Sequence, residues 1–351
     1  VMKKILFCGG GSAGHVMPNI ALARELEGKF ETEYMGTEGI EYAICRSEGI
    51  KFFTFSAPKL VRGKIFANLS IPAQLKRSVD EAKNILLREK PCLLFCKGGY
   101  VSLPPALAAK KLGIPVLTHE SDLSPGLANK IISRFALATL TSFPETAEKF
   151  ARGRYCGSPI RREARRGSRA RAMEKFGLDA RPTVLVFGGG SGSKAINAAL
   201  REKIKDICAE YNVLHVCGKG NKIDAKVYGY VQAEFIADIG EAYACADCAV
   251  ARAGSNSAFE LITNGIPTLF IPLENGATRG DQVKNAEYFA KAGLCRILRE
   301  KELSPEKLKE KIFELMGDRQ LKNNLKDFNP PRGNERIVAE IERAAIHSKM
   351  G

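Results

Sequence analysis

The fold is decided by two glycine-rich stretches, Gly9-Gly10-Gly11-Ser12-Ala13-Gly14-His15 and Gly188-Gly189-Gly190-Ser191-Gly192-Ser193. An apolar run typical of a buried strand precedes each of them, Ile5-Leu6-Phe7-Cys8 in one case and Val184-Leu185-Val186-Phe187 in the other. A strand that ends in small residues and leads into a helix is the usual beginning of a nucleotide-binding α/β domain. Because this beginning occurs twice, about half the chain apart, the sequence predicts two similar domains with a phosphorylated ligand in the cleft between them.

The length and composition agree with two domains. The chain has 351 residues, and 45% of them are hydrophobic, which is enough for two cores. Its 54 Lys and Arg residues exceed its 39 Asp and Glu residues, and this net charge of +15 attracts the phosphates of a nucleic acid, an anionic lipid or a substrate. We expect no nucleic-acid partner, because the sequence has no recognition-helix motif, zinc-finger spacing or aromatic RNA-binding signature.

The ten cysteines are scattered along the chain. Cys245 and Cys248 form a lone C-x-x-C within a helical pattern over 242–249, and no second pair stands at zinc spacing. We therefore expect reduced, buried cysteines in a cytosolic protein and no metal site. The N-terminal apolar run is too short for a signal peptide, and no stretch is long enough to span a membrane, so we expect a soluble protein or one attached to a membrane surface.

Strand-like and helix-like segments alternate in both halves, which predicts parallel sheets covered by helices on both faces. In the first half we expect strands at 33–35, 51–55, 92–96, 114–118 and 138–141, and helices at 18–26, 39–48, 71–89, 104–112 and 124–135. In the second half we expect strands at 184–187, 213–217, 248–251, 268–271 and 296–298, and helices at 194–211, 239–246, 257–264, 282–292, 304–316 and 335–347.

An arginine-rich stretch without apolar periodicity, 161–171, marks the predicted domain boundary. The Asn329-Pro330-Pro331-Arg332-Gly333 break allows the last helix to leave the second domain and pack on the first. We therefore expect one domain at 1–162 with the helix 335–351, and a second domain at 163–334.

The first glycine loop satisfies G-x-G-x-x-G, which alone is a weak signal. A dinucleotide site would need an acidic residue at the tip of the second strand, and Glu38 is a poor candidate there. His15 lies at the predicted helix start, where the positive helix end disfavours its protonation. It is either a capping residue or a neutral imidazole that accepts a proton.

The second loop departs from the dinucleotide pattern, because Ser193 stands where the third glycine should be. Its backbone N–H groups and hydroxyls at a helix start suit a diphosphate. The stretch Arg252–Glu260 repeats the order of strand, small polar turn and helix. Glu260 either binds a ribose diol or stabilises the helix N-terminus.

Two further stretches place carboxylates where such folds hold their ligands. His119-Glu120-Ser121-Asp122 follows a predicted strand, and its acids are either catalytic or capping residues. Arg279-Gly280-Asp281-Gln282 opens a helix and suits sugar hydroxyls. No D-x-D sequence occurs, so we expect no metal-bound diphosphate.

The apolar stretch Ile65–Leu75 is flanked by basic residues. Apolar residues with basic neighbours suit the surface of an anionic bilayer, although a buried loop and helix would have the same composition. The flanking residues are Arg62, Lys64, Lys76 and Arg77.

Together these motifs resemble one family, MurG, the N-acetylglucosamine transferases of peptidoglycan synthesis. The resemblance runs from about residue 4 to beyond residue 300, with the motifs in order. It is carried by Gly9–His15 with Pro18, Lys97-Gly98-Gly99-Tyr100-Val101-Ser102, Gly113-Ile114-Pro115, His119-Glu120, Pro125–Lys130, Gly157–Arg161, Gly188–Asn197, Phe235-Ile236, Arg252–Glu260, and Asp281-Gln282 with Asn285.

The resemblance implies a GT-B fold, which has two Rossmann-like domains facing across a cleft. It also implies transfer of N-acetylglucosamine from UDP-N-acetylglucosamine to the 4-hydroxyl of undecaprenyl-diphosphate N-acetylmuramyl-pentapeptide, with inversion, at the cytoplasmic face of the cell membrane. The N-terminal domain would bind this acceptor and the membrane, and the C-terminal domain would bind the donor. No cofactor is implied.

The resemblance also implies residue roles. His15 would lie by the reacting centre as the base, with Glu120 or Asp122 as alternatives. On the acceptor side the resemblance places Ser12, Ala13, Gly14, His15, Tyr100 and Asn129. On the donor side it places Arg161 near the phosphates, Ile236 at uracil and Glu260 at ribose, together with Gly190, Ser191, Ser193, Phe235, Arg252, Gly254, Ser255, Asn256, Asp281 and Gln282.

Three departures affect these roles. The family motif after the histidine often reads Glu-Gln-Asn, whereas this chain has Glu120-Ser121-Asp122. Asp281 stands in place of a glutamine, and Gly190 stands where many members have serine.

Other functions stay open at this point. They are a UDP-N-acetylglucosamine epimerase of the same architecture, a glycolipid transferase acting on diacylglycerol, a nicotinamide dehydrogenase, and a non-catalytic nucleotide-sugar binder.

Overall fold

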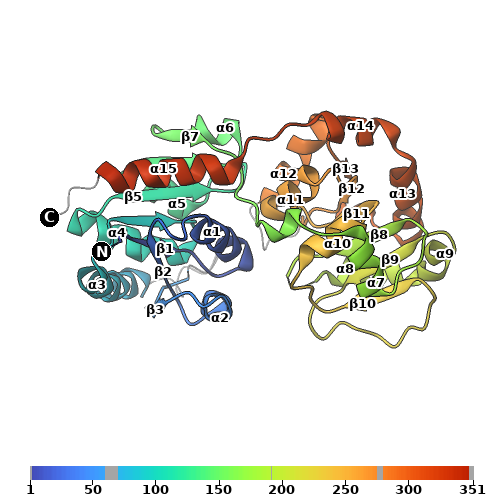
Figure 1. Cartoon of the computed structure of the whole chain (residues 1–351), viewed down its shortest axis with the longest axis horizontal. Coiled ribbons are helices and arrows are strands. Elements are labelled where there is room, and N and C mark those ends of the chain that lie inside the picture. Colours follow the sequence, from blue (N-terminus) through green and yellow to red (C-terminus); the bar gives the residue numbers. More distant parts are fainter. Residues whose placement is uncertain (1, 60–69, 191, 275–279, 348–351) are drawn as a thin grey trace. The chain divides into compact units, whose positions relative to one another are not determined.

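The computed structural model describes residues 2–59, 70–190, 192–274 and 280–347, which belong to two compact units (Figure 1). Unit 1 comprises Val1–Ile160 and Pro331–Gly351, and unit 2 comprises Arg161–Pro330. The predicted boundaries, at 162/163 and 334/335, lie close to the two points where the chain passes between the units. That unit 1 binds the acceptor and unit 2 the donor stays a prediction.

Unit 1 is built on a seven-stranded parallel sheet of order β3-β2-β1-β4-β5-β6-β7. The chain reverses its direction of travel across the sheet between β1 and β4, which makes this pair the topological switch point. The strands are β1 (Lys4–Cys8), β2 (Glu31–Gly36), β3 (Phe52–Thr54), β4 (Leu93–Cys96), β5 (Val116–Glu120), β6 (Ala138–Thr141) and β7 (Gly153–Tyr155).

Alternate residues of β1 enter two different hydrophobic cores, as a strand covered on both faces requires. Ile5 and Phe7 belong to the core that includes the C-terminal helix, whereas Leu6 and Cys8 belong to the core on the other face. The helices of unit 1 are α1 (Ala13–Glu25), α2 (Ile40–Ser47), α3 (Ile71–Glu89), α4 (Leu103–Leu112), α5 (Leu127–Ile132), α6 (Pro144–Ala147) and α15 (Gly333–His347), with the 3₁₀ turn η2 (Tyr100–Ser102).

The last helix, α15, packs in unit 1, where Figure 1 shows it in red among elements from the start of the chain. Ile337 and Ile341 are fully buried there beside residues of α1 and β4. Asn334 fixes its beginning, because the Asn334 side chain accepts a hydrogen bond from Ile160 N (2.7 Å) and donates one to Ile160 O (2.9 Å).

Unit 2 repeats the arrangement with a six-stranded parallel sheet of order β10-β9-β8-β11-β12-β13 and its switch point between β8 and β11. The strands are β8 (Thr183–Phe187), β9 (Asn212–Val216), β10 (Tyr230–Ala233), β11 (Cys248–Ala251), β12 (Thr268–Phe270) and β13 (Arg296–Ile297). The helices are α7 (Arg169–Phe176), α8 (Lys194–Glu202), α9 (Ile204–Cys208), α10 (Ile239–Cys245), α11 (Ser255–Thr263), α12 (Asp281–Lys291), α13 (Pro305–Gly317) and α14 (Arg319–Asp327), with the 3₁₀ turns η3 (Glu163–Arg165) and η4 (Glu300–Glu302).

The predicted fold class, an α/β chain with two Rossmann-like parallel-sheet domains, is confirmed. Several element predictions are wrong. The helix predicted at 18–26 begins at Ala13, with Pro18 inside it, and the helix predicted at 194–211 breaks at Lys203. The helical pattern over 242–249 does not hold throughout, because Cys245 ends α10 and Cys248 begins β11, the strand predicted at 248–251. Five short helices and strands were not predicted, namely β7, β10, α6, α7 and α14.

All ten cysteines are free thiols, and nine of them are buried. Within the part of the chain that the structure describes, no helix is long and apolar enough to cross a membrane.

Candidate functional site

The candidate acceptor residues of unit 1 gather at the carboxyl ends of β1 and β4, on either side of the switch point. Ser12, Ala13, Gly14 and His15 form the end of the first glycine loop and the first turn of α1. Tyr100 begins the turn after β4, and its ring lies 2.8 Å from the point where a methyl group at Gly11 would be. The two loops therefore pack closely together, and this contact leaves no space for a side chain at Gly11.

The first glycine loop is fixed by a buried carboxylate that the sequence did not reveal. Glu41 of α2 is fully buried, and its Oε2 accepts a hydrogen bond from Gly11 N (3.1 Å). Its Oε1 accepts bonds from Thr37 N (3.1 Å) and Thr37 Oγ1 (2.5 Å). A methyl group at Gly10 would overlap this carboxylate. An internal anion thus already takes a loop amide that a phosphate would otherwise use.

His15 lies in the first turn of α1 and is half-buried. Its Nδ1 is 3.1 Å from Gly10 O and 3.1 Å from Ser12 Oγ. Because a carbonyl oxygen only accepts hydrogen bonds, we infer that Nδ1 carries the hydrogen in the neutral ring. The lone pair then lies on Nε2, the nitrogen that a general base would use.

Glu120 lies within β5, not after it as predicted, and holds the following turn together. Its side chain is 5% exposed and accepts bonds from Asp122 N (3.0 Å), Gly126 N (2.8 Å) and Asn129 Nδ2 (2.9 Å). Burial, followed by the charge of Asp122, raises the pKa of Glu120 above its usual value.

Asn129 is also buried and bonded within the protein. Its Oδ1 accepts from Thr118 Oγ1 (2.6 Å), and its Nδ2 donates to His119 O (3.2 Å) as well as to Glu120. Asp122 is half-buried in the turn itself. Of the three polar residues in this region, Asp122 is therefore the most accessible to a substrate.

Beneath this turn lies Lys97, which is 1% exposed. Its Nζ lies 2.5 Å from His119 Nδ1 and 2.6 Å from Ser121 Oγ. Burial lowers the pKa of Lys97 to about 7, although the charges of Glu120 and Asp122 act in the opposite direction. The short Ser121 side chain, one of the departures from the family motif, stands where Lys97 reaches it.

In unit 2 the second glycine loop joins β8 to α8 at the switch point. Its two ends are tightly packed, because a methyl group at Gly188 or Gly192 would overlap backbone atoms. Its middle is open, because a methyl group at Gly189 or Gly190 would meet nothing within 4 Å. Ser191, predicted to bind the donor, lies outside the described residues.

Arg252 supports this loop from the neighbouring turn after β11. Its guanidinium donates to Ser193 Oγ (2.8 Å) and Ile271 O (3.0 Å) and forms an ion pair with Glu300. Arg252 is nearly buried, so its contacts are with the protein. The predicted donor residues Ser193 and Arg252 are thus brought together.

Glu260 of α11 is buried and held from two sides. Arg161 pairs with both carboxylate oxygens, with Nε–Oε1 and Nη2–Oε2 distances of 3.0 Å, and the Tyr243 hydroxyl donates to Oε2 at 2.9 Å. Burial lowers the pKa of Arg161, but the charge of Glu260 and its hydrogen bonds raise it more, so the net direction is upward. This geometry fixes the direction in which Glu260 presents its carboxylate.

The other predicted donor residues lie along the same carboxyl edge of the sheet. Ile236 is buried, whereas the Phe235 side chain is 74% exposed. Gly254 caps α11, and Ser255 and Asn256 form its first turn. Asp281 and Gln282 begin α12, where Gln282 Oε1 accepts a bond from Leu273 N (3.0 Å).

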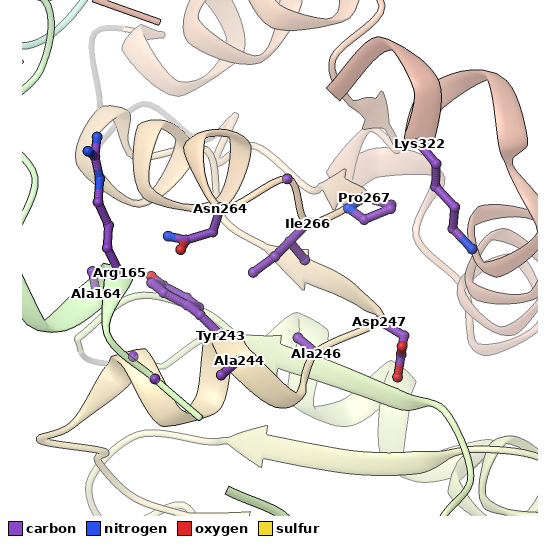
Figure 2. Close-up of a pocket in the computed structure, with 13 residues that line it drawn as sticks. Ala164, Arg165, Tyr243, Ala244, Ala246, Asp247, Asn264, Ile266, Pro267 and Lys322 are labelled. Carbon is purple, nitrogen blue, oxygen red and sulfur yellow. The ribbon is translucent and has the colours of Figure 1, made fainter. Parts of the chain in front are cut away.

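A separate hollow of about 490 Å³ lies at the other edge of this sheet, before β11 and β12. Figure 2 shows it between Tyr243 and Asn264 on one side and Asp247 and Lys322 on the other. None of the predicted donor residues lines it. We therefore do not identify it with the donor site.

Sequence reasoning missed Glu41, Lys97 and Tyr243. Glu41 and Tyr243 lie inside ordinary helical patterns, and their partners are distant in sequence. Lys97 had a usable signal, because a lysine at the end of an apolar strand run is rarely placed there without a partner. Among the described residues, no group of three or more His, Cys, Asp and Glu side chains could hold a metal ion.

Comparison with known proteins identifies both halves. The glycosyltransferase family 28 N-terminal domain matches residues 5–141, and the glycosyltransferase family 28 C-terminal domain matches residues 183–337. A Clostridium novyi (strain NT) protein is 41% identical over 352 residues, covering 97% of this chain and 98% of that protein. A Shouchella clausii (strain KSM-K16) protein is 44% identical over 329 residues, covering 91% and 92%. Both are named UDP-N-acetylglucosamine–N-acetylmuramyl-(pentapeptide) pyrophosphoryl-undecaprenol N-acetylglucosamine transferase.

Solved structures of glycosyltransferases are similar to this chain, in agreement with the family match. The crystal structure of Acinetobacter baumannii MurG matches with a TM-score of 0.75 and 26% identity, covering 97% of this chain and 99% of that one. The glycosyltransferase of kitacinnamycin matches with a TM-score of 0.74 over 98% of this chain and 100% of that one, but at 16% identity it supports the fold alone. The fold of this chain is therefore GT-B.

Proposed function

Since this chain belongs to the MurG family, we propose that it transfers N-acetylglucosamine from UDP-N-acetylglucosamine to undecaprenyl-diphosphate N-acetylmuramyl-pentapeptide. The structural observation that carries the proposal is the Glu260 carboxylate, held by Arg161 and Tyr243 behind the turn at the switch point of unit 2. A fixed carboxylate beside a glycine loop suits the ribose and the diphosphate of a nucleotide sugar.

The family resemblance assigns the donor contacts, and this arrangement supports them. Glu260 accepts hydrogen bonds from the ribose hydroxyls, and the main chain at Ile236 meets uracil. The second glycine loop and the first turn of α11 bind the diphosphate through helix N-termini. Gln282 uses its oxygen on Leu273 N, so its amide NH₂ is the group that donates to the sugar, beside Asp281.

On the acceptor side His15 is the general base. It takes the proton from the acceptor 4-hydroxyl on Nε2 while that oxygen attacks the anomeric carbon and UDP leaves with inversion. Glu120 is a weaker candidate for a base, because all three of its hydrogen bonds hold the turn after β5, and taking up a proton would weaken these bonds. Asp122 is the alternative base. Ser12, Ala13, Gly14 and Tyr100 border the acceptor diphosphate, and Asn129 supports the turn from below.

The predicted membrane contact, Ile65–Leu75, lies half outside the described residues, and its second half begins α3. Lys76 and Arg77 are exposed in the first turns of this helix. We propose that this end of α3 meets anionic lipid at the cytoplasmic face of the membrane.

Co-sedimentation of the protein with lipid vesicles tests this membrane contact. We expect co-sedimentation with vesicles that contain anionic lipid, but not with zwitterionic vesicles. Equal sedimentation with both would contradict it.

The function is tested with labelled UDP-N-acetylglucosamine in the presence and absence of the undecaprenyl-linked acceptor. We expect sugar transfer only with the acceptor, and no product from the donor alone. Epimerised donor without acceptor would support an epimerase, and faster transfer to diacylglycerol would support a glycolipid transferase. UDP binding without turnover of any acceptor would indicate a non-catalytic nucleotide-sugar binding protein.

Glu260→Gln tests the donor site in the same assay. The loss of a charge-assisted bond to ribose is expected to weaken UDP binding about 100-fold, on the order of 3 kcal/mol. Glu310→Gln is the matched control, because Glu310 is exposed on α13. Unchanged UDP affinity in Glu260→Gln, measured by calorimetry, would refute the assigned role.

His15→Gln tests the base. We expect kcat to fall about 100-fold or more with little change in the KM of either substrate. Near-normal turnover with weakened acceptor binding would reassign His15 to binding, and Asp122→Asn is then the variant in which the loss of kcat is expected.

A further inference from the structure

Lys97 is an unusual residue to find in the core of unit 1. It is 1% exposed, and among the described residues no carboxylate lies within ion-pair distance of its Nζ. A buried lysine without such a partner carries a desolvation penalty that the fold must offset elsewhere. Features that oppose stability are found preferentially at functional sites.

The position of Lys97 connects three loops. It follows β4 directly, and its Nζ bonds to His119 of β5 and to Ser121 in the turn after β5. Its Cβ lies 3.0 Å from the point where a methyl group at Gly9 would be, at the end of β1. The loops after β1, β4 and β5 therefore meet around this one side chain.

The hydrogen bonds of His119 fix the direction of the contact. Its Nε2 lies 3.2 Å from Gly157 O, so the hydrogen is on Nε2 and Nδ1 accepts from Lys97. Burial and the neighbouring lysine lower the pKa of His119 well below its usual value, which keeps the ring neutral. His119 is thus a fixed acceptor for Lys97.

Lys97 connects to two candidate catalytic groups, to Asp122 through its side chain and to His15 through the backbone turn that follows it. Ser121 immediately precedes Asp122. Gly98 and Gly99 follow Lys97 with φ of +89° and +76°, and the His15 ring lies 3.3 Å from the point where a methyl group at Gly99 would be. The turn that begins at Lys97 therefore packs against His15, and its side chain holds the residue before Asp122.

We propose that Lys97 is a positioning residue of the acceptor site, which aligns the His15 loop and the Asp122 turn through its bonds to His119 and Ser121. The proposal rests on the proposed function, because it assigns these loops to the acceptor. Lys97 touches no substrate, since its Nζ is enclosed by the protein. The loss of Lys97 is therefore expected to lower kcat/KM for the acceptor and to leave the UDP affinity of unit 2 unchanged.

The test compares Lys97→Met, Ser121→Ala and the double variant with the wild-type protein. We expect kcat/KM for the acceptor to fall about 100-fold in Lys97→Met and about tenfold in Ser121→Ala, the scale expected for misplaced catalytic groups. Because Ser121 acts through Lys97, the double variant should lose no more than Lys97→Met alone. UDP affinity, measured by calorimetry, should stay within twofold of wild type in all three.

Lys111→Met is the matched control, because Lys111 is exposed on α4 of the same unit, and it should retain wild-type kinetics. The proposal would be overturned if the losses of kcat/KM in the two single variants multiplied in the double variant, or if Lys97→Met kept the wild-type kcat/KM. A fall in UDP affinity as large as the fall in kcat/KM would also overturn it. Denaturant unfolding checks that the variants are folded. If Lys97→Met does not fold, Ser121→Ala, which is a smaller change, still tests the proposal. No transfer by the wild-type protein would instead refute the proposed function.

Discussion

The two glycine loops have similar sequences but different surroundings. In unit 1 the Glu41 carboxylate accepts a hydrogen bond from Gly11 N, and beneath the loop lies the buried Lys97, whose pKa is lowered to about 7. In unit 2 the space beside Gly189 and Gly190 is open among the described residues. The cation that supports this loop is Arg252, which is paired with Glu300. A glycine-rich strand–helix turn therefore identifies the architecture, whereas its neighbours decide whether its amides are available to an anion.

The largest effect should separate the two loops directly. In Gly10→Ala the new methyl group overlaps the buried Glu41 carboxylate, so we expect the free energy of unfolding of unit 1 to fall by about 3 kcal/mol or more. In Gly190→Ala the methyl group has no neighbour within 4 Å, and we expect a change below about 1 kcal/mol. Denaturant midpoints measure both, and equal midpoints would show that the surroundings of the loops do not differ as described.

A second effect concerns the cation beneath the second loop. Arg252→Met removes the bonds to Ser193 and Ile271 and leaves Glu300 without its ion-pair partner. We expect UDP binding to weaken about 30-fold, on the order of 2 kcal/mol, because the loop loses its support. Arg319→Met, at an exposed residue of unit 2, is the control and should bind UDP as wild type does. Undiminished affinity in Arg252→Met would mean that the loop holds its shape without this arginine.

The third effect is a pH dependence that only the first loop should show. The folded protein lowers the pKa of Lys97 to about 7 from its ordinary 10.5, because the charged form is desolvated. Between these two pH values the unfolded chain binds a proton that the folded chain does not, so stability rises with pH. This contribution is complete above about pH 10.5 and is lost as the pH falls to about 7.

The expected slope is about 1.4 kcal/mol per pH unit within that window. It is measured as the difference in unfolding free energy between wild type and Lys97→Met, so that groups unaffected by the substitution cancel. The titratable groups around Lys97 whose own protonation could contribute are His119, Glu120 and Asp122. A difference that does not change with pH would mean that Lys97 keeps its ordinary pKa.

The alternation of apolar runs and glycine turns was sufficient to predict the two sheets, because a strand buried on both faces leaves a continuous apolar signal. It failed for β7 and β10, where the strands are short and partly exposed, and at Lys203, where one helical pattern contains two helices. Pattern reasoning places an element but not its ends, since the ends depend on tertiary contacts.

The candidate site divides in the same way. Glu260 and Ser193 follow strand–turn signatures, which marked them as candidates, and the family resemblance assigned them to the donor. Glu41 and Tyr243 were not, because each acts on a loop or helix that is distant in the sequence, and one sequence contains no record of such pairs. Chain position predicts which residues reach the carboxyl edge of a sheet, but it does not predict what lies beneath them.

The smallest effect concerns how the second unit holds its own carboxylate. Glu41 in unit 1 is held by loop amides, whereas Glu260 is held by Arg161 and by the Tyr243 hydroxyl, which comes from the wall of the hollow in Figure 2. Tyr243→Phe removes one hydrogen bond to Glu260 and leaves the ring and the Arg161 pair in place. We expect UDP affinity to fall about fivefold, on the order of 1 kcal/mol, with kcat unchanged at saturating donor. Tyr228→Phe is the control, because Tyr228 is highly exposed in the same unit. If Tyr243→Phe binds UDP as tightly as the control, Arg161 alone orients Glu260, and the donor carboxylate differs from Glu41 in depending on one charged partner only.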